Sequence, residues 1–258
     1  MLRFAALVIA MIATVGARIA HADPDDLIAK PLVLVPGHVD AFATLETDIS
    51  SGLHGEPLSL APDVWVGVLP ELTVGVIHSD LSVDRIGAGA SFCIETQRII
   101  CPNAYHGTGL DALYSIATGS FSAAVRARAL IREFHPYFEP AATLGALLRW
   151  HRGRWSITGD PFVQIGLDNN RYGNYSAIWV PVVFAMQPIE HVAIELHTGW
   201  NGDFYEIYDG WYTPAALGVR GAITPHFEVG VLAGWLSIFG PQNDEKLRVL
   251  MFDVGWHE

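Results

Sequence analysis

The sequence predicts an all-β protein, a membrane-spanning up-and-down antiparallel β-barrel of about twelve strands. Hydrophobic residues make up 51% of the chain and charged residues only 16%, whereas soluble domains usually carry about 25% charge. Beyond residue 22 no apolar run reaches the roughly 18 residues that a transmembrane helix needs. Apolar residues instead stand at every second position in repeated segments, which is the side-chain period of a β-strand.

The charge of the chain excludes one class of partner. With 15 Lys+Arg against 27 Asp+Glu, the formal net charge is −12. Nucleic-acid binding needs a basic face to meet phosphates, so we expect no nucleic-acid partner. The high apolar content also excludes a disordered chain.

The first element is an N-terminal signal peptide, residues 1–22. Arg3 gives a positive start, an apolar stretch follows, and Ala20-His21-Ala22 is a small-x-small cleavage site. An uncleaved anchor helix is the alternative, but Arg18 and His21 interrupt the apolar run. Export would carry the chain out of a bacterial cytoplasm, leaving a periplasmic N-terminal segment at 23–38 and a barrel at 39–258.

Twelve alternating segments follow in order. They span 39–50, 58–69, 72–80, 109–118, 121–133, 140–151, 155–168, 177–187, 191–201, 210–222, 227–239 and 247–257. In the clearest one, Phe121, Val125 and Ile131 share an apolar face, and three arginines lie on the other face. As a helix, the same segment would scatter those arginines around its axis.

The connections between these segments alternate in length. Short ones fall at 70–71, 119–120, 152–154, 188–190 and 224–226, and longer ones at 51–57, 81–108, 135–139, 169–176, 202–209 and 240–246. Membrane barrels have short periplasmic turns and long outer loops. The pattern therefore places both ends of the barrel on the periplasmic side.

A soluble β-barrel would turn its apolar faces inward. Alternation alone does not distinguish a soluble barrel from a membrane barrel. Three features favour the inverted arrangement. The small apolar residues would not fill so wide a lumen, the signal peptide leads to the correct compartment, and aromatics end the apolar faces as an interfacial belt requires. Those aromatics are Trp150 and Trp155 at the periplasmic ends and Trp200, Trp211 and Trp235 at the outer ends.

The residues 39–258 resemble a Gram-negative outer-membrane β-barrel protein of porin-like type. The strand–turn–strand segments 60–79 and 218–235 have the form common in such barrels, and the C-terminal strand is similar to their assembly signal, although His257 and Glu258 follow Trp256. The resemblance implies location in the outer membrane, with outer-membrane lipid and the barrel-assembly machinery as partners. It does not specify function, since such barrels include pores, enzymes and adhesins.

If the apolar faces meet lipid, the opposite faces line the lumen. The alternation assigns to it Glu46, Asp63, Asp111, Arg126, Arg128, Arg132, Arg149, Asp160, Glu195, His197, Arg220 and Glu228, together with Asp40, Asp48, Asp168 and Asp253. Charges in a lumen must be hydrated or paired. They would form either a structural ion-pair network or a transverse field that orients polar solutes in a pore.

The remaining motifs are weaker. Cys93 and Cys101, eight positions apart, predict a local disulfide in an oxidising compartment, and with His106 they make a poor zinc signal. Asp203, Glu206 and Asp209 do not follow a calcium-loop spacing. Glu195 and His197 could act as a general base, but no nucleophile is evident beside them. No catalytic residue, cofactor or metal is therefore assigned.

The prediction is a passive pore or channel for small polar solutes. Two alternatives remain open. One is a barrel enzyme acting on envelope lipid, and the other is a non-conducting structural or surface barrel.

Overall fold

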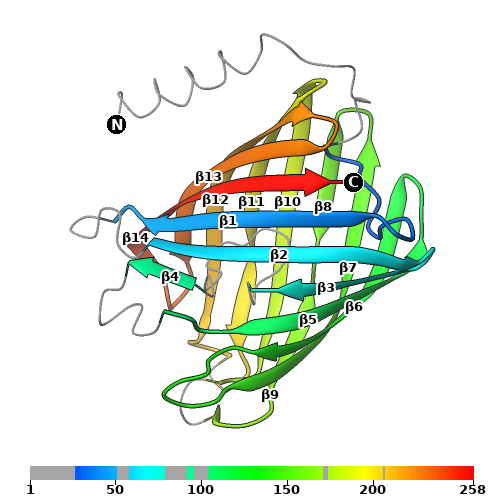
Figure 1. Ribbon diagram of the computed structural model, residues 1–258. Helices are drawn as coiled ribbons and strands as arrows, with labels where there is room; N and C mark the ends of the chain where they lie inside the picture. The colour runs from blue at the N-terminus through cyan, green and yellow to red at the C-terminus, as the bar shows by residue number, and fades with distance from the viewer. Residues whose placement is uncertain (1–26, 51–57, 79–91, 96–103, 171–173, 206) are drawn as a thin grey trace.

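The protein is a closed antiparallel β-barrel (Figure 1). The computed structural model describes residues 27–50, 58–78, 92–95, 104–170, 174–205 and 207–258. The strands are β1 Val39–Asp48, β2 Leu58–Leu69, β3 Leu72–Ile77, β4 Phe92–Glu95, β5 Thr108–Ala117, β6 Phe121–Ile131, β7 Pro140–Arg152, β8 Trp155–Gly159, β9 Phe162–Gly166, β10 Ala177–Ile189, β11 Val192–Asp203, β12 Trp211–Thr224, β13 Phe227–Phe239 and β14 Asp244–His257.

The ring closes through β1. This strand pairs with β14 on one side, where Ala41 faces Trp256, and with β2 on the other, where Ala41 faces Val64. Around the ring, hydrogen-bonded neighbours follow the order β1-β14-β13-β12-β11-β10-β8-β7-β6-β5-β3-β2. The predicted up-and-down barrel of about twelve strands is confirmed.

The segment 155–168, predicted as one strand, is divided at Asp160-Pro161. Pro161 has no N–H to give to a ladder, while the Asp160 N–H still donates to the carbonyl of Pro181 at 3.1 Å. Both pieces, β8 and β9, pair with β7 and β10. They therefore fill one position of the ring.

A second difference lies in the long connection predicted at 81–108. Its described part contains β4, which pairs with the outer part of β2 through Ser59 and Cys93. The sequence Phe-Cys-Ile-Glu is too short to show a period. The strand forms because β2 extends beyond β3 and offers it an edge: β3 pairs with β2 only between Val64 and Leu69.

The two faces of the wall differ as the alternation predicts. On β6, Arg126 and Arg128 are buried, while Val125 between Ala124 and Arg126 is 41% exposed. Large apolar side chains on the strands cover the outside, among them Leu110, Leu144, Ile165 and Leu217. Among the described residues, no helix is long and apolar enough to cross a membrane.

Several predictions fall outside the described residues. The signal peptide 1–22 lies there, as do Cys101 and Glu206. The Cys93–Cys101 disulfide and the cleavage of the signal peptide therefore stay predictions.

Candidate functional site: the lumen and its N-terminal segment

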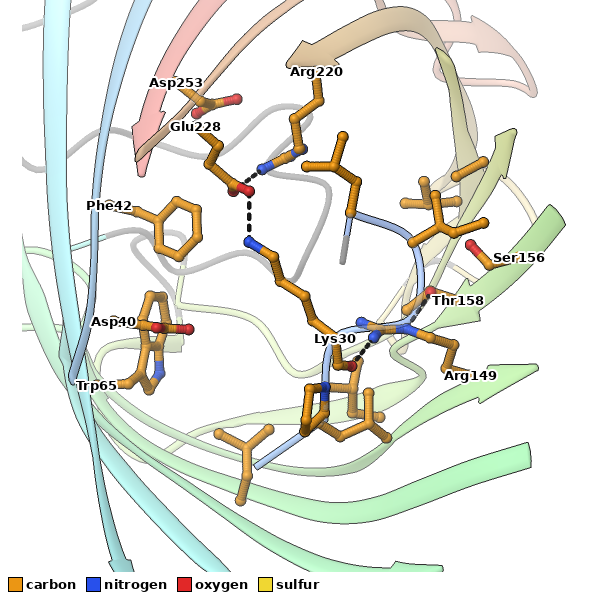
Figure 2. A pocket seen from close by; sticks show the side chains of 18 of the residues that line it. Lys30, Asp40, Phe42, Trp65, Arg149, Ser156, Thr158, Arg220, Glu228 and Asp253 are labelled. Atoms are coloured by element: carbon orange, nitrogen blue, oxygen red, sulfur yellow. Dashed lines mark hydrogen bonds and ion pairs between the residues drawn. The ribbon is translucent and has the colours of Figure 1, made fainter. Parts of the chain in front are cut away.

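A cavity of about 250 Å³ lies inside the barrel. Its walls come from the strands and also from the residues that precede β1 (Figure 2). Figure 2 shows Arg149, Ser156 and Thr158 on one side, and Phe42, Trp65, Glu228 and Asp253 on others. Polar and apolar side chains thus share the lining.

The N-terminal segment, defined here as residues 27–35, lies in the lumen. Ile28 is 3% exposed and packs against Ala185 and Ala193 of the inner wall. Leu32 and Val33 pack against a second apolar cluster, formed by Leu113, Ala124 and Leu147. Apolar burial thus anchors the segment at two places on the wall, on β10 and β11 and on β5, β6 and β7.

Hydrogen bonds hold the N-terminal segment between these two apolar contacts. The Lys30 ammonium donates to Glu228 Oε2 at 2.6 Å. The Lys30 carbonyl accepts from Arg149 Nη1, and the Leu34 N–H donates to Thr73 Oγ1 at 2.7 Å. The backbone also passes close to β2, where a Cβ on Gly67 would lie 2.2 Å from the Val35 carbonyl oxygen.

The first charged group of the wall is the arginine–aspartate cluster: Arg126, Arg128, Asp111 and Asp160. Arg126 contacts Asp111 at 2.5 Å and Asp160 at 2.6 Å, and Arg128 Nη2 donates to Asp160 at 2.9 Å. Both aspartate side chains are fully buried. Two cations and two anions neutralise one another, which is what buried charges require.

Aromatic rings complete this cluster. Trp65 Nε1 donates to Asp111 Oδ2 at 3.0 Å, and the Arg128 guanidinium lies over the Phe162 ring, 4.9 Å from its centroid. Planar guanidinium groups favour both bidentate carboxylate contacts and aromatic faces. The cluster joins β2, β5, β6 and the β8–β9 junction from inside the barrel.

The second group is the glutamate chain, which runs from His197 through Glu195, Arg220 and Glu228 to Lys30. Glu195 accepts from His197 Nε2 at 2.9 Å and from Arg220 Nε at 3.1 Å. Arg220 Nη1 donates to Glu228 at 2.8 Å. The chain crosses β11, β12 and β13 and ends on the N-terminal segment.

At the end of this chain stands His257. Its Nε2 lies 2.8 Å from Lys30 Nζ and 3.3 Å from Glu228 Oε2. Its Nδ1 lies 2.9 Å from Asp40 Oδ1. Charged and polar contacts therefore continue into β14 and β1, across the closure of the barrel.

Most of the residues assigned to the lumen are buried in the structure. Asp63, Asp111, Arg126, Arg128, Asp160, Glu195, His197 and Glu228 are buried, while Glu46, Arg132, Arg149 and Arg220 are half-buried. Asp63, Arg126, Arg149, Glu195, His197, Arg220 and Glu228 line the cavity. Asp168 is exposed, because it lies beyond the end of β9.

The structure adds participants that the alternation did not reveal. Lys30 lies outside every predicted strand, so no face could be assigned to it. Trp65 was not singled out, although it shares the inward parity of Asp63. The signal for the segment was the sequence Leu-Ile-Ala-Lys-Pro-Leu-Val-Leu-Val at 27–35, which is too apolar to lie free in water.

The pair Glu195 and His197 lies within the glutamate chain. Glu195 holds both His197 and Arg220, an arrangement that fixes the imidazole rather than leaving it facing a nucleophile. Among the described residues, no group of three His, Cys, Asp or Glu side chains is placed to hold a metal ion.

Comparison with known proteins shows the fold. No family model matches the chain, and no curated protein sequence matches it. Among solved structures, the NanC porin has a TM-score of 0.60 at 8% identity, covering 84% of this chain and 98% of that one. A KdgM porin in complex with disordered oligogalacturonate has a TM-score of 0.54 at 8% identity and the same coverage.

A third similar structure is the COG4313 outer membrane channel from Pseudomonas putida F1. Its TM-score is 0.56 at 12% identity, covering 92% of this chain and all of that one. The chain thus has the fold of outer-membrane porins and channels over most of its length.

Proposed function

We propose that the protein is a passive outer-membrane pore for small polar solutes. The observation that carries this proposal is a closed ring that is apolar outside and encloses a cavity bordered by charged side chains. A lipid-exposed wall needs an apolar surface and internally satisfied backbone groups. A polar interior is expected where water or a solute reaches the lumen.

The proposed location rests on several features together. The exposed outer faces carry Leu110, Leu144 and Leu217, the similar folds are outer-membrane proteins, and residues 1–22 have the features of a signal peptide. The barrel-assembly machinery would recognise the C-terminal strand, and outer-membrane lipid would surround the wall.

The size of the proposed solute follows from the N-terminal segment. This segment occupies lumen space from Ile28 to Val33, and the remaining cavity is about 250 Å³. The ion-pair clusters stiffen the wall, so that the passage is set by side chains rather than by collapse of the barrel. Small solutes and ions fit such a passage, and large oligomers do not.

The direct test is current through planar bilayers containing the purified full chain. The proposal predicts discrete, ohmic steps at low voltage. Folding is checked in parallel by heat-modifiable gel migration and by β-type circular dichroism in detergent. Folded protein that inserts and gives no steps would contradict the proposal.

One observation favours a second candidate, the non-conducting structural barrel. The N-terminal segment is held by burial and by three polar bonds, and a segment that never left would restrict the lumen permanently. The two candidates differ in one variant. In a variant that releases the N-terminal segment, a pore should conduct both before and after release, with a changed current. A non-conducting barrel should show current only after the segment is released.

A further inference from the structure

Two charges on the cavity wall differ from their neighbours. Arg126 contacts Asp111 and Asp160, Arg220 contacts Glu195 and Glu228, Lys30 contacts Glu228, and Asp40 contacts His257. Among the described residues, no oppositely charged group lies within 4 Å of Arg149 or of Asp253. Arg149 instead donates to Thr158 Oγ1 at 3.2 Å and to the Lys30 carbonyl, and Asp253 Oδ1 accepts a hydrogen bond from Thr44 Oγ1 at 2.6 Å.

These two charges face each other across the barrel. Arg149 is on β7 and Asp253 is on β14, and five strand positions separate β7 from β14 in either direction around the ring. Both side chains line the same cavity, and Figure 2 shows them on its opposite sides. The cavity thus carries a cation on one wall and a carboxylate on the opposite wall, and neither forms a contact ion pair with a described residue. Glu195 acts on Arg149, and Arg220 on Asp253, only at longer range.

The neighbours of each charge suit one kind of ligand group. Beside Arg149, the Ser156 and Thr158 hydroxyls line the cavity, and a guanidinium with nearby hydroxyls favours a carboxylate. On the other side, Phe42 and Trp65 lie with ring centroids 6.1 Å apart. Aromatic faces attract an ammonium group, and Asp253 lines the same cavity.

We propose that the cavity binds an extended zwitterion, a short peptide, with its carboxylate at Arg149 and its ammonium near Asp253. An anion alone would leave Asp253 without a contacting cation, and a cation alone would leave Arg149 without a contacting anion. Burying an unpaired charge costs more than burying a paired one, so the zwitterion satisfies both walls at once. The inference rests on the proposed function, since it names the solute class of that lumen.

The test is calorimetric binding to the full chain in detergent, with glycine, diglycine and triglycine as probes. These three carry the same charges at increasing separation. Each is compared with its N-acetyl form, which lacks the ammonium, and its amide, which lacks the carboxylate. The expected result is that at least one zwitterion binds tenfold or more tightly than both of its singly charged forms.

Two variants test which end of the ligand binds at Arg149 and which at Asp253. Arg149→Gln should abolish the preference over the amide and keep the preference over the N-acetyl form. Asp253→Asn should do the reverse. Arg152→Gln and Asp244→Asn, which change exposed charges on the same two strands, should leave both preferences unchanged.

The outcomes are distinct from those of the conductance test. No binding of any probe, equal binding of a zwitterion and a singly charged form, or variants that lower all affinities alike would overturn the inference. If the protein conducts ions but shows no zwitterion preference, the pore proposal stands and this inference fails. If zwitterions bind but no current appears, the binding site stands and the pore proposal fails.

Discussion

Lys30 Nζ lies 2.6 Å from Glu228 Oε2, and this contact joins two residues 198 positions apart. Glu228 is on β13 and is also held by Arg220, so the N-terminal segment is attached to a network that spans the wall. In the proposed pore, the chain's own N-terminal residues would narrow the lumen.

Removal of this contact should increase the current. Lys30→Met keeps the aliphatic length of the side chain and removes the ammonium. A hydrogen bond to a charged group contributes about 1.5–3 kcal/mol, so the ratio of released to seated segment should rise roughly tenfold or more. Single-channel recording would show a larger open fraction. Lys246→Met, at an exposed position, is the control, and identical recordings from both variants would contradict this role.

A methyl group at Gly67 should displace the N-terminal segment without any change of charge. Its Cβ would lie 2.2 Å from the Val35 carbonyl oxygen, so the backbone there must move. We expect a Val33→Cys reporter to be labelled faster by a water-soluble thiol reagent when Gly67→Ala is added. Gly159→Ala is the control, because its Cβ would meet an atom only at 3.7 Å. Equal labelling in both backgrounds would mean that the segment is not seated against β2.

Loss of Arg126 should destabilise the barrel. Arg126→Met leaves the fully buried Asp111 and Asp160 with only Arg128 as a cation, and breaking a buried charge pair typically costs about 3–5 kcal/mol. Chemical unfolding in detergent or lipid would measure the loss. Arg154→Met, at an exposed position in the β7–β8 turn, should change stability by much less. A similar small effect for both would show that the cluster does not brace the wall.

An arginine on the outer surface should have an effect that depends on its depth. Leu217 is 66% exposed at the middle of β12, and Leu69 is 52% exposed at the turn end of β2. If lipid covers the wall, Leu217→Arg should cost about 2–4 kcal/mol and Leu69→Arg about 0–1 kcal/mol. Equal costs, measured by unfolding from lipid bilayers, would argue against a membrane-spanning wall.

The sequence predicts the barrel well because each strand repeats a local rule. On β6 and β13 the alternation alone separates the residues that face inward, such as Arg126 and Glu228, from those that face outward. The break at Asp160-Pro161 was less visible, since both pieces keep the same parity on either side of the proline. Strand β4 depends on an edge that only the folded β2 provides.

The sequence predicts which side chains face the lumen but not the contacts between them. Alternation places Arg126, Asp111 and Asp160 inside, but their mutual contacts depend on the register between β5, β6 and β8. The position of Lys30 depends on a segment with no period, whose place is fixed by packing against Ala185 and Ala193. That no described residue of opposite charge lies within 4 Å of Arg149 or Asp253 is likewise a property of the closed ring.

The most direct measurement is the single-channel current of Ser156→Cys before and after a charged, water-soluble thiol reagent is added. Ser156 is 4% exposed and lines the cavity, while its neighbour Ile157 is 39% exposed on the outer face. If current passes through the lumen, modification of Ser156→Cys lowers each step, and the same treatment of Ile157→Cys and of the unmodified chain leaves it unchanged. Equal currents before and after confirmed modification of Ser156→Cys would show that the lumen is not the conducting path.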